Sequence, residues 1–295
     1  MMNRRILQLL KLIGIAIFLW ILIRIDRKEL IEQVKGANLP LLLSSYIIIY
    51  IIYAAKTLRW HMLVKNAGLN PTFSQSWHLY NIGVFLALVT PAKLGELGRA
   101  AYLRNSGMHG ATAVSIVILD RLADVSGIGI IAIVSAGILF GWIWSLVVLV
   151  VALSGLLILI LLRKKLSSVC TSLTWLTFLP KLLKPKTLFF ISITTLISWA
   201  IYFTWALLIA RSIGVNTAIP ILVSVFTITG ILALIPIAPS GLGTRDAALV
   251  ALLAPYGILA EQAVAQALLM FTIIILSGAL GMWYWLVKPV EMRKN

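Results

Sequence analysis

The stretch that decides the fold is "LVTPAKLGELGRAAYL", residues 88–103, which ends a strongly apolar run. Within it, Pro91, Gly95 and Gly98 stand among a lysine, a glutamate and an arginine. Proline removes a backbone donor and glycine permits tight turns, so this segment breaks a helix. Opened backbone cannot face lipid and must be buried in protein or line a wet cavity. The stretch therefore predicts a broken or re-entrant helix if the chain lies in a membrane.

The composition places the chain in a membrane. Hydrophobic residues make up 61% of the sequence, charged residues only 12%, and the mean hydropathy is +1.04. Soluble domains carry about 25% charged residues, so this balance excludes a soluble domain. The net charge of +16 comes from basic residues that fall between apolar runs, which is typical of cytoplasmic loops facing anionic lipid. We therefore expect membrane lipids as partners and no nucleic acid.

A helix needs about 20 apolar residues to span a bilayer, and the sequence contains a series of such runs. We expect one all-α domain over residues 1–295, a polytopic integral membrane bundle of about 7–9 hydrophobic helices with one or two re-entrant or broken helices. A basic loop, 163–187, separates a first half, 1–162, from a second half, 188–295, and the pattern allows a repeat of the two halves. The apolar runs lie near residues 6–23, 39–55, 76–90, 112–140, 143–162, 187–210, 217–238, 244–260 and 263–287.

Charge sets the expected topology. The basic loop 163–187 is predicted to be cytoplasmic, as are segment 91–111 and both termini of this cell-membrane protein. The N-terminus and segment 91–111 can share one side only if run 76–90 enters the bilayer and returns, because two full crossings precede it. Run 244–260 is short, and either a crossing or a re-entrant segment fits it.

The broken segment has a counterpart in the second half, "IPIAPSGLGTRDAALVALL", residues 235–253. Both copies read P-x-x-L-G, and an arginine follows each, Arg99 and Arg245. Chance similarity between two loops is one interpretation. Interrupted helices at corresponding places in two halves are also the sequence sign of a transporter's central site. The residues that break the helices are Pro91, Gly95, Pro239, Gly241 and Gly243.

Charged residues also stand inside "VSIVILDRLADVSGIGIIAIV", residues 114–134. Asp120 and Asp124 share a helical face, and Arg121 can pair with Asp124 three residues on. They form either a structural ion pair or the lining of a polar cavity. Asp246 either orients Arg245 or begins a helix, where acids are favourable.

The basic, aromatic segment 54–68 follows the second apolar run. It is interpreted first as an anchor at the membrane interface, with a head-group contact by Arg59 as the alternative.

Four motifs in order resemble the lysylphosphatidylglycerol synthase transmembrane-region family, also called flippase-like domain proteins. They are Arg59-Trp60; Pro91, Leu94, Gly95, Glu96 and Arg99; Asp120, Arg121 and Asp124; and Pro239, Gly241, Leu242, Gly243, Arg245 and Asp246. The resemblance implies a multi-helix domain that moves or handles polar-headed lipids. In the namesake synthase this domain is fused to a soluble aminoacyl-transfer domain. We expect that domain to be missing here, because the sequence ends at Asn295, and lysyl transfer is therefore not inherited.

We expect a flippase-like lipid transporter without cofactor, metal site or catalytic residues, whose oligomeric state stays open. The expected head-group ligands are Arg99, Arg121, Arg245, Arg59 and Lys93, and the expected supporting acids are Glu96, Asp120, Asp124 and Asp246. One alternative is an integral-membrane lipid-modifying transferase that uses the acids as bases. Another is a non-catalytic membrane partner of a separate lipid synthase or glycosyltransferase.

Overall fold

A computed structural model of the chain describes residues 23, 26–169, 184–233 and 243–287. Helices make up the fold, and none of the described residues lies in a β-strand, which confirms the predicted all-α bundle. The elements in order are α2 Arg27–Lys35, α3 Leu39–Asn66, α4 Phe73–Val89, the 3₁₀ helix η1 Pro91–Leu97, α5 Gly98–Asn105, α6 Gly110–Phe140, α7 Trp142–Val169, α9 Pro185–Ser212, α10 Ile219–Leu232, α11 Thr244–Leu253, the 3₁₀ turn η4 Ala254–Tyr256 and α12 Ala260–Val287.

Four of these helices are long and apolar enough to cross a membrane. They are α3, α9 and α12, of 28 residues each, and α6, of 31 residues. At 1.5 Å per residue, 28 residues reach about 42 Å, which exceeds the roughly 30 Å of a bilayer's hydrocarbon core. The chain is therefore an integral membrane protein.

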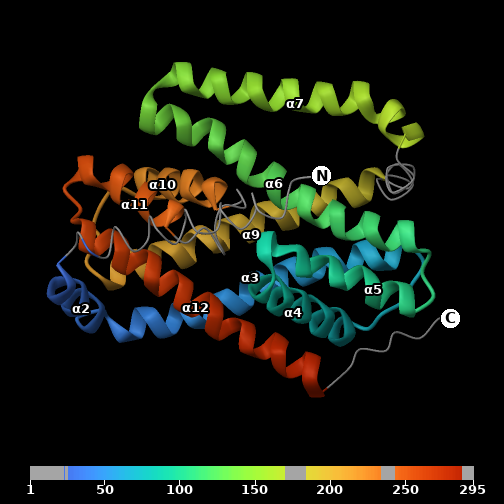
Figure 1. The fold of residues 1–295 in the computed structure, drawn as a ribbon, viewed down its shortest axis with the longest axis horizontal. Helices are drawn as coiled ribbons and strands as arrows, with labels where there is room; N and C mark the ends of the chain where they lie inside the picture. The colour runs from blue at the N-terminus through green and yellow to red at the C-terminus, as the bar shows by residue number, and fades with distance from the viewer. Residues whose placement is uncertain (1–22, 24–25, 170–183, 234–242, 288–295) are drawn as a thin grey trace.

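Helices α3 and α9 run antiparallel through the centre and define the two ends of the bundle (Figure 1). At one end, the Asn38 N–H donates a hydrogen bond of 2.7 Å to the Ser212 carbonyl. At the other, the Asn66 amide donates to the Thr187 hydroxyl at 2.9 Å. These are called the Asn38 end and the Asn66 end. The first residues of α12 lie at the Asn38 end, where Glu261 accepts a hydrogen bond from a backbone N–H before α2.

Helix α4 and the segments after it form a hairpin that enters from the Asn66 end. Helix α4 runs antiparallel to α12, and the rings of His78 and Tyr284 lie 4.1 Å apart at that end. After Val89 the chain turns, and η1 folds back on α4, where the Gly95 N–H donates to the Thr90 hydroxyl at 2.7 Å. A side chain at position 95 would collide with the Leu86 backbone. Helix α5 then leads back to the start of α6 (Figure 1). This is the return expected of run 76–90.

Helices α10 and α11 form a second hairpin, which enters from the Asn38 end. Helix α10 begins just after the end of α9, and α11 ends just before α12 begins at that same end. With 14 and 10 residues, the two helices reach only about 21 and 15 Å, so neither crosses the bilayer. Run 244–260, left open by the sequence, therefore holds a short helix and a turn. The two hairpins enter the bundle from opposite ends (Figure 1).

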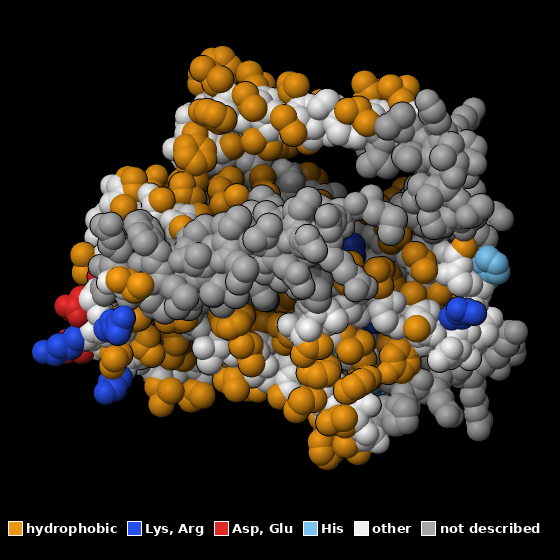
Figure 2. Space-filling view, in the orientation of Figure 1, with side chains coloured by type: hydrophobic (Ala, Val, Ile, Leu, Met, Phe, Trp, Pro, Cys, Tyr) orange, Lys and Arg blue, Asp and Glu red, His pale blue; other side chains and the backbone are white. Residues whose placement is uncertain are grey.

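Helix α7 packs along α6 and turns an apolar surface outward. Its described side chains are mostly exposed, including Trp142 and Trp144. Figure 2 shows these hydrophobic groups over α7 and a cluster of charges at the end that carries α2. That distribution suits apolar flanks in lipid and a charged end in water. Helix α7 continues to Val169 and α9 begins at Pro185, so the basic segment 163–187 is helical at both edges.

Candidate functional site

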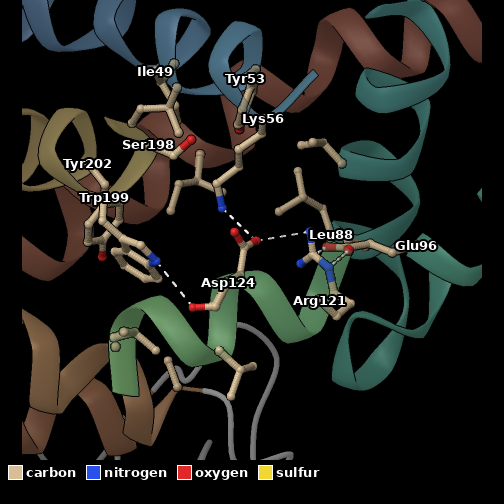
Figure 3. Close-up of a pocket in the computed structure, with 18 of the residues that line it drawn as sticks. Ile49, Tyr53, Lys56, Leu88, Glu96, Arg121, Asp124, Ser198, Trp199 and Tyr202 are labelled. Carbon is tan, nitrogen blue, oxygen red and sulfur yellow. Dashed lines mark hydrogen bonds and ion pairs between the residues drawn. The ribbon is translucent and has the colours of Figure 1, made fainter. Parts of the chain in front are cut away.

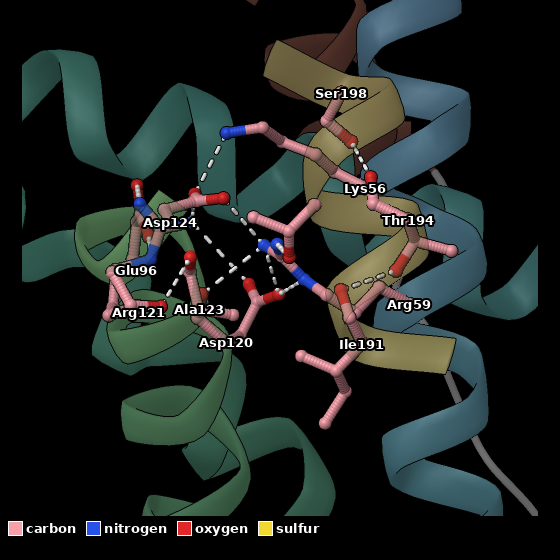
Figure 4. A network of polar contacts seen from close by, with 12 residues as sticks. Lys56, Arg59, Glu96, Asp120, Arg121, Ala123, Asp124, Ile191, Thr194 and Ser198 are labelled. Carbon is pink, nitrogen blue, oxygen red and sulfur yellow. Dashed lines mark hydrogen bonds and ion pairs between the residues drawn. The ribbon is translucent and has the colours of Figure 1, made fainter. Parts of the chain in front are cut away.

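A buried network of ion pairs lies in the middle of the bundle (Figure 4). We call it the central ion network. Helix α3 contributes Lys56 and Arg59, one turn apart, and α6 contributes three further groups from its own inward face. The first hairpin supplies the remaining two. The members are Lys56, Arg59, Glu96, Arg99, Asp120, Arg121 and Asp124.

Arg59 joins α3 to α6 and α9 and has no exposed surface. Its guanidinium donates to the Asp120 carboxylate at 2.9 Å and to the Asp124 carboxylate at 2.8 Å. A third bond of 2.8 Å goes to the Thr195 hydroxyl. Because each of its nitrogens is occupied in this way, Arg59 holds the two aspartates in place, and it is not among the residues that line the cavity described below.

Arg99 is the second internal arginine. Its Nη2 donates to Glu96 at 3.2 Å and to Asp120 at 3.1 Å, and its guanidinium carbon lies 4.3 Å from the centre of the Trp60 ring. The side chain passes α4 at Gly83, where an added Cβ would lie 2.6 Å from the Arg99 Cδ. Glycine at this position opens the path by which Arg99 reaches Asp120.

Arg121 and Lys56 are the two basic members of the network whose side chains keep substantial exposed surface. The Arg121 side chain is 34% exposed. Its Nε lies 2.7 Å from the Glu96 carboxylate, and its Nη2 lies 3.3 Å from the Asp124 carboxylate. The last contact confirms the predicted pairing of residues 121 and 124. The Lys56 side chain is 18% exposed, and its ammonium donates to Asp124 at 2.8 Å. The indole N–H of Trp199 donates to the Asp124 carbonyl at 3.3 Å beside it.

Both of these cations face a cavity of about 480 Å³ (Figure 3). Aliphatic and aromatic side chains from α3, α4, α6, α9 and α12 form most of its wall, and α10 adds Thr229 and Gly230. The first hairpin contributes Leu94, Glu96 and Leu97, and the second contributes Arg245 and Leu249. The cavity therefore lies between the two hairpins, with charge concentrated on the side of α6. Its polar lining residues are Tyr53, Lys56, Tyr80, Glu96, Arg121, Asp124, Ser198, Tyr202, Thr229 and Arg245.

Arg245 reaches the cavity from the first turn of α11. Gly243, with a φ of +84°, ends the turn that precedes this helix, and its N–H donates to Asp246 at 2.9 Å. Asp246 also accepts from Arg245 at 3.3 Å, while the same guanidinium donates to the Ala267 carbonyl of α12 at 3.0 Å. Asp246 thus does both things that the sequence suggested, since it begins a helix and orients Arg245. The Nε of Arg245 is buried and has no hydrogen-bond partner in the part of the chain that the structure describes.

The remaining predicted residues are placed as follows. Pro91 begins η1, and Lys93 lies on η1 with a side chain outside the described atoms. Pro239 and Gly241 lie outside the described residues, so the second P-x-x-L-G copy is seen only from Gly243 onward. Within the described ranges, no group of three His, Cys, Asp or Glu side chains could hold a metal ion.

Sequence reasoning missed Lys56 as part of the site and included it only in the interface anchor of segment 54–68. The signal was present, because Lys56 stands three residues before Arg59 and so shares its helical face. Tyr53 and Trp199 were missed as well, since nothing in a long apolar run marks which aromatic residue faces a cavity.

Comparison with known proteins gives one family. The family model described as "Lysylphosphatidylglycerol synthase TM region" matches residues 8–281. No curated protein and no solved structure matches the chain.

Proposed function

The chain belongs to the lysylphosphatidylglycerol synthase TM-region family, and from this premise we propose that it is a flippase-like transporter of polar-headed lipids. The head group enters the central cavity while the acyl or prenyl chains stay in the surrounding lipid. The proposal further places the protein in the cell membrane, with the Asn66 end facing the cytoplasm. Basic side chains lie at both ends, but those at the Asn66 end have no described acid among them, which supports this orientation; they are Lys65, Arg104, Lys184 and Lys186.

One observation carries the proposal, which is that the cavity lies between two hairpins that enter from opposite ends. Arg121 and Glu96 border it beside the first hairpin, and Arg245 borders it from the second. Transporters commonly build their central site from such broken helices, because opened backbone in a membrane is tolerated only where it is buried or lines a cavity. The arrangement gives a polar position near mid-membrane that each hairpin covers from one side.

The chemistry of the cavity suits the head group of an amphiphile. Arginine forms charge-assisted, often bidentate hydrogen bonds with phosphate oxygens, and Arg121 and Arg245 both face the cavity. The Nε of Arg245 is a buried donor without an acceptor among the described residues, so an oxygen from a ligand would satisfy it. Apolar walls would accept the part of the lipid next to the phosphate.

Transport of a fluorescent phospholipid in reconstituted vesicles tests this function. We expect the wild-type protein to move the probe between leaflets and both Arg245→Ala and Arg121→Ala to reduce the rate by about tenfold or more, because each removes charge-assisted bonds worth about 1.5–3 kcal/mol. Arg104→Ala, at an exposed position at the end of α5, is the matched control and should behave as wild type. Equal rates in wild-type and cavity variants would refute the assignment of the cavity as the transport site.

A further inference from the structure

We propose that Lys56 makes the cavity selective for lipids whose head group carries one net negative charge, such as a phosphodiester without an amine. This inference rests on the proposed function, since it takes the cavity as the head-group site. It goes further by naming the charge class of the lipid and the residue that sets it.

The charges around the cavity do not cancel. On the side of the first hairpin, four basic groups face three carboxylates in the central ion network. On the side of the second hairpin, Arg245 pairs with Asp246 alone, which leaves no net charge there. One positive charge is therefore left over among the described groups. An uncompensated charge in a low-dielectric interior is costly, and a ligand with one negative charge would neutralise it.

Lys56 is the cation that supplies this excess. Arg59 and Arg99 are buried and each binds two carboxylates, so they serve the network itself. Arg121 contacts Glu96 through two nitrogens, at 2.7 and 2.9 Å, and also contacts Asp124. Lys56 in contrast contacts a single carboxylate, that of Asp124, which Arg59 and Arg121 already bind. Removing its charge would leave every carboxylate paired.

The position of Lys56 also allows it to reach a ligand. Its side chain is 18% exposed into the cavity, and an ammonium has three donors on a flexible stem. The Lys56 ammonium can therefore keep its hydrogen bond to the Asp124 carboxylate while it donates a second one to a phosphate oxygen. The ammonium lies 5.7 Å from the centre of the Trp199 ring, which adds a second favourable contact on the same side of the cavity. A head group that carries its own amine would bring a second cation next to Lys56 and leave the excess charge unneutralised.

The test compares two lipids with the same chains, phosphatidylglycerol and phosphatidylethanolamine, which share a phosphodiester and differ by an amine. The first measurement is the ratio of the two lipids that the detergent-purified protein retains from an equimolar mixture, read by mass spectrometry. The second is translocation of each lipid in vesicles. A polyprenyl-phosphate-linked sugar, also a phosphodiester with one negative charge, forms a separate arm that distinguishes a phospholipid from a prenyl lipid as the source.

We expect wild type to retain phosphatidylglycerol over phosphatidylethanolamine by about tenfold, which corresponds to a modest electrostatic difference at one site. Lys56→Gln should bring the ratio close to one, and Lys56→Arg should keep the preference because it keeps the charge. Lys65→Gln, at an exposed position on the same helix, should leave the ratio at the wild-type value. Thermal unfolding of each purified variant shows whether the fold is intact.

Three results would overturn the inference. The first is a wild-type protein without preference between the two lipids, and the second is a Lys56→Gln variant that keeps the wild-type ratio. The third is loss of the preference in Lys56→Arg, which would show that charge is not the selecting property. Failure of the proposed function looks different, because wild type would then retain lipid selectively while translocating neither lipid.

Discussion

Replacing Arg59 with methionine should destabilise the protein whether or not lipid is bound. Methionine matches much of the length of arginine but removes the bonds to Asp120, Asp124 and Thr195. Breaking a buried ion pair by removing one partner typically costs about 3–5 kcal/mol, because the other charge is left buried. Here Asp120 keeps Arg99 at 3.1 Å and Asp124 keeps Lys56 at 2.8 Å, so we expect the lower end, about 3 kcal/mol.

The assay is thermal unfolding of the purified protein in detergent, with Arg104→Met as the control for loss of an exposed arginine. A loss of about 3 kcal/mol should lower the midpoint by roughly 6 °C or more. The double variant Arg59→Met with Asp120→Asn should recover part of the loss, since contacting charges couple by about 0.5–3 kcal/mol. The reasoning fails if Arg59→Met has the same unfolding midpoint as Arg104→Met. It also fails if the destabilisation of the double variant equals the sum of those of its two single variants, because the guanidinium then does not hold the network.

Two glycine substitutions test the packing that places the hairpins. Gly281→Ala should lower the unfolding midpoint by several degrees, because its Cβ would collide with the Asn81 backbone where α4 packs on α12. Gly129→Ala on α6, with open space around position 129, is its control and should match wild type. Gly243→Ala should cost about 1–3 kcal/mol, since alanine is strained at a φ of +84°, and equal unfolding midpoints for Gly243→Ala and wild type would contradict this backbone conformation. Asp246→Ala should cost about 3 kcal/mol or more, because it removes the acceptor of the Gly243 N–H and leaves the buried Arg245 without its one described carboxylate partner.

Much of the fold follows from sequence because a bilayer limits the choices. Apolar runs predicted the long helices, and the balance of charge predicted that run 76–90 enters and returns, as α4 and η1 do. The pairing of Arg121 with Asp124 followed from helical spacing, and the contact of Arg245 with Asp246 was suggested by their adjacency in the sequence. These features are local, or they depend on composition alone.

Tertiary contacts decide which arginines are buried in ion pairs and which line the cavity, so this could not be predicted from the sequence. The sequence placed Arg59 and Arg99 with Arg121 as head-group ligands, whereas the structure buries the first two against Asp120. Contacts with residues up to 136 positions away, such as that between Arg59 and Thr195, decide which basic side chain keeps exposed surface. Of run 217–238, the described part holds α10, a helix of 14 residues, and residues 234–238 lie outside the described residues.

The opposed hairpins also have an electrical consequence. Because each hairpin reaches only part of the way through the bundle, the barrier between the cavity and either face is thinner than the bilayer itself. The membrane voltage falls across the barrier that is closed at a given moment. A head group that passes first one barrier and then the other therefore carries its charge through the whole membrane potential. One elementary charge gains or loses about 2.3 kcal/mol per 100 mV. For a lipid with one net charge, the membrane potential alone would then favour one leaflet by about fiftyfold at 100 mV.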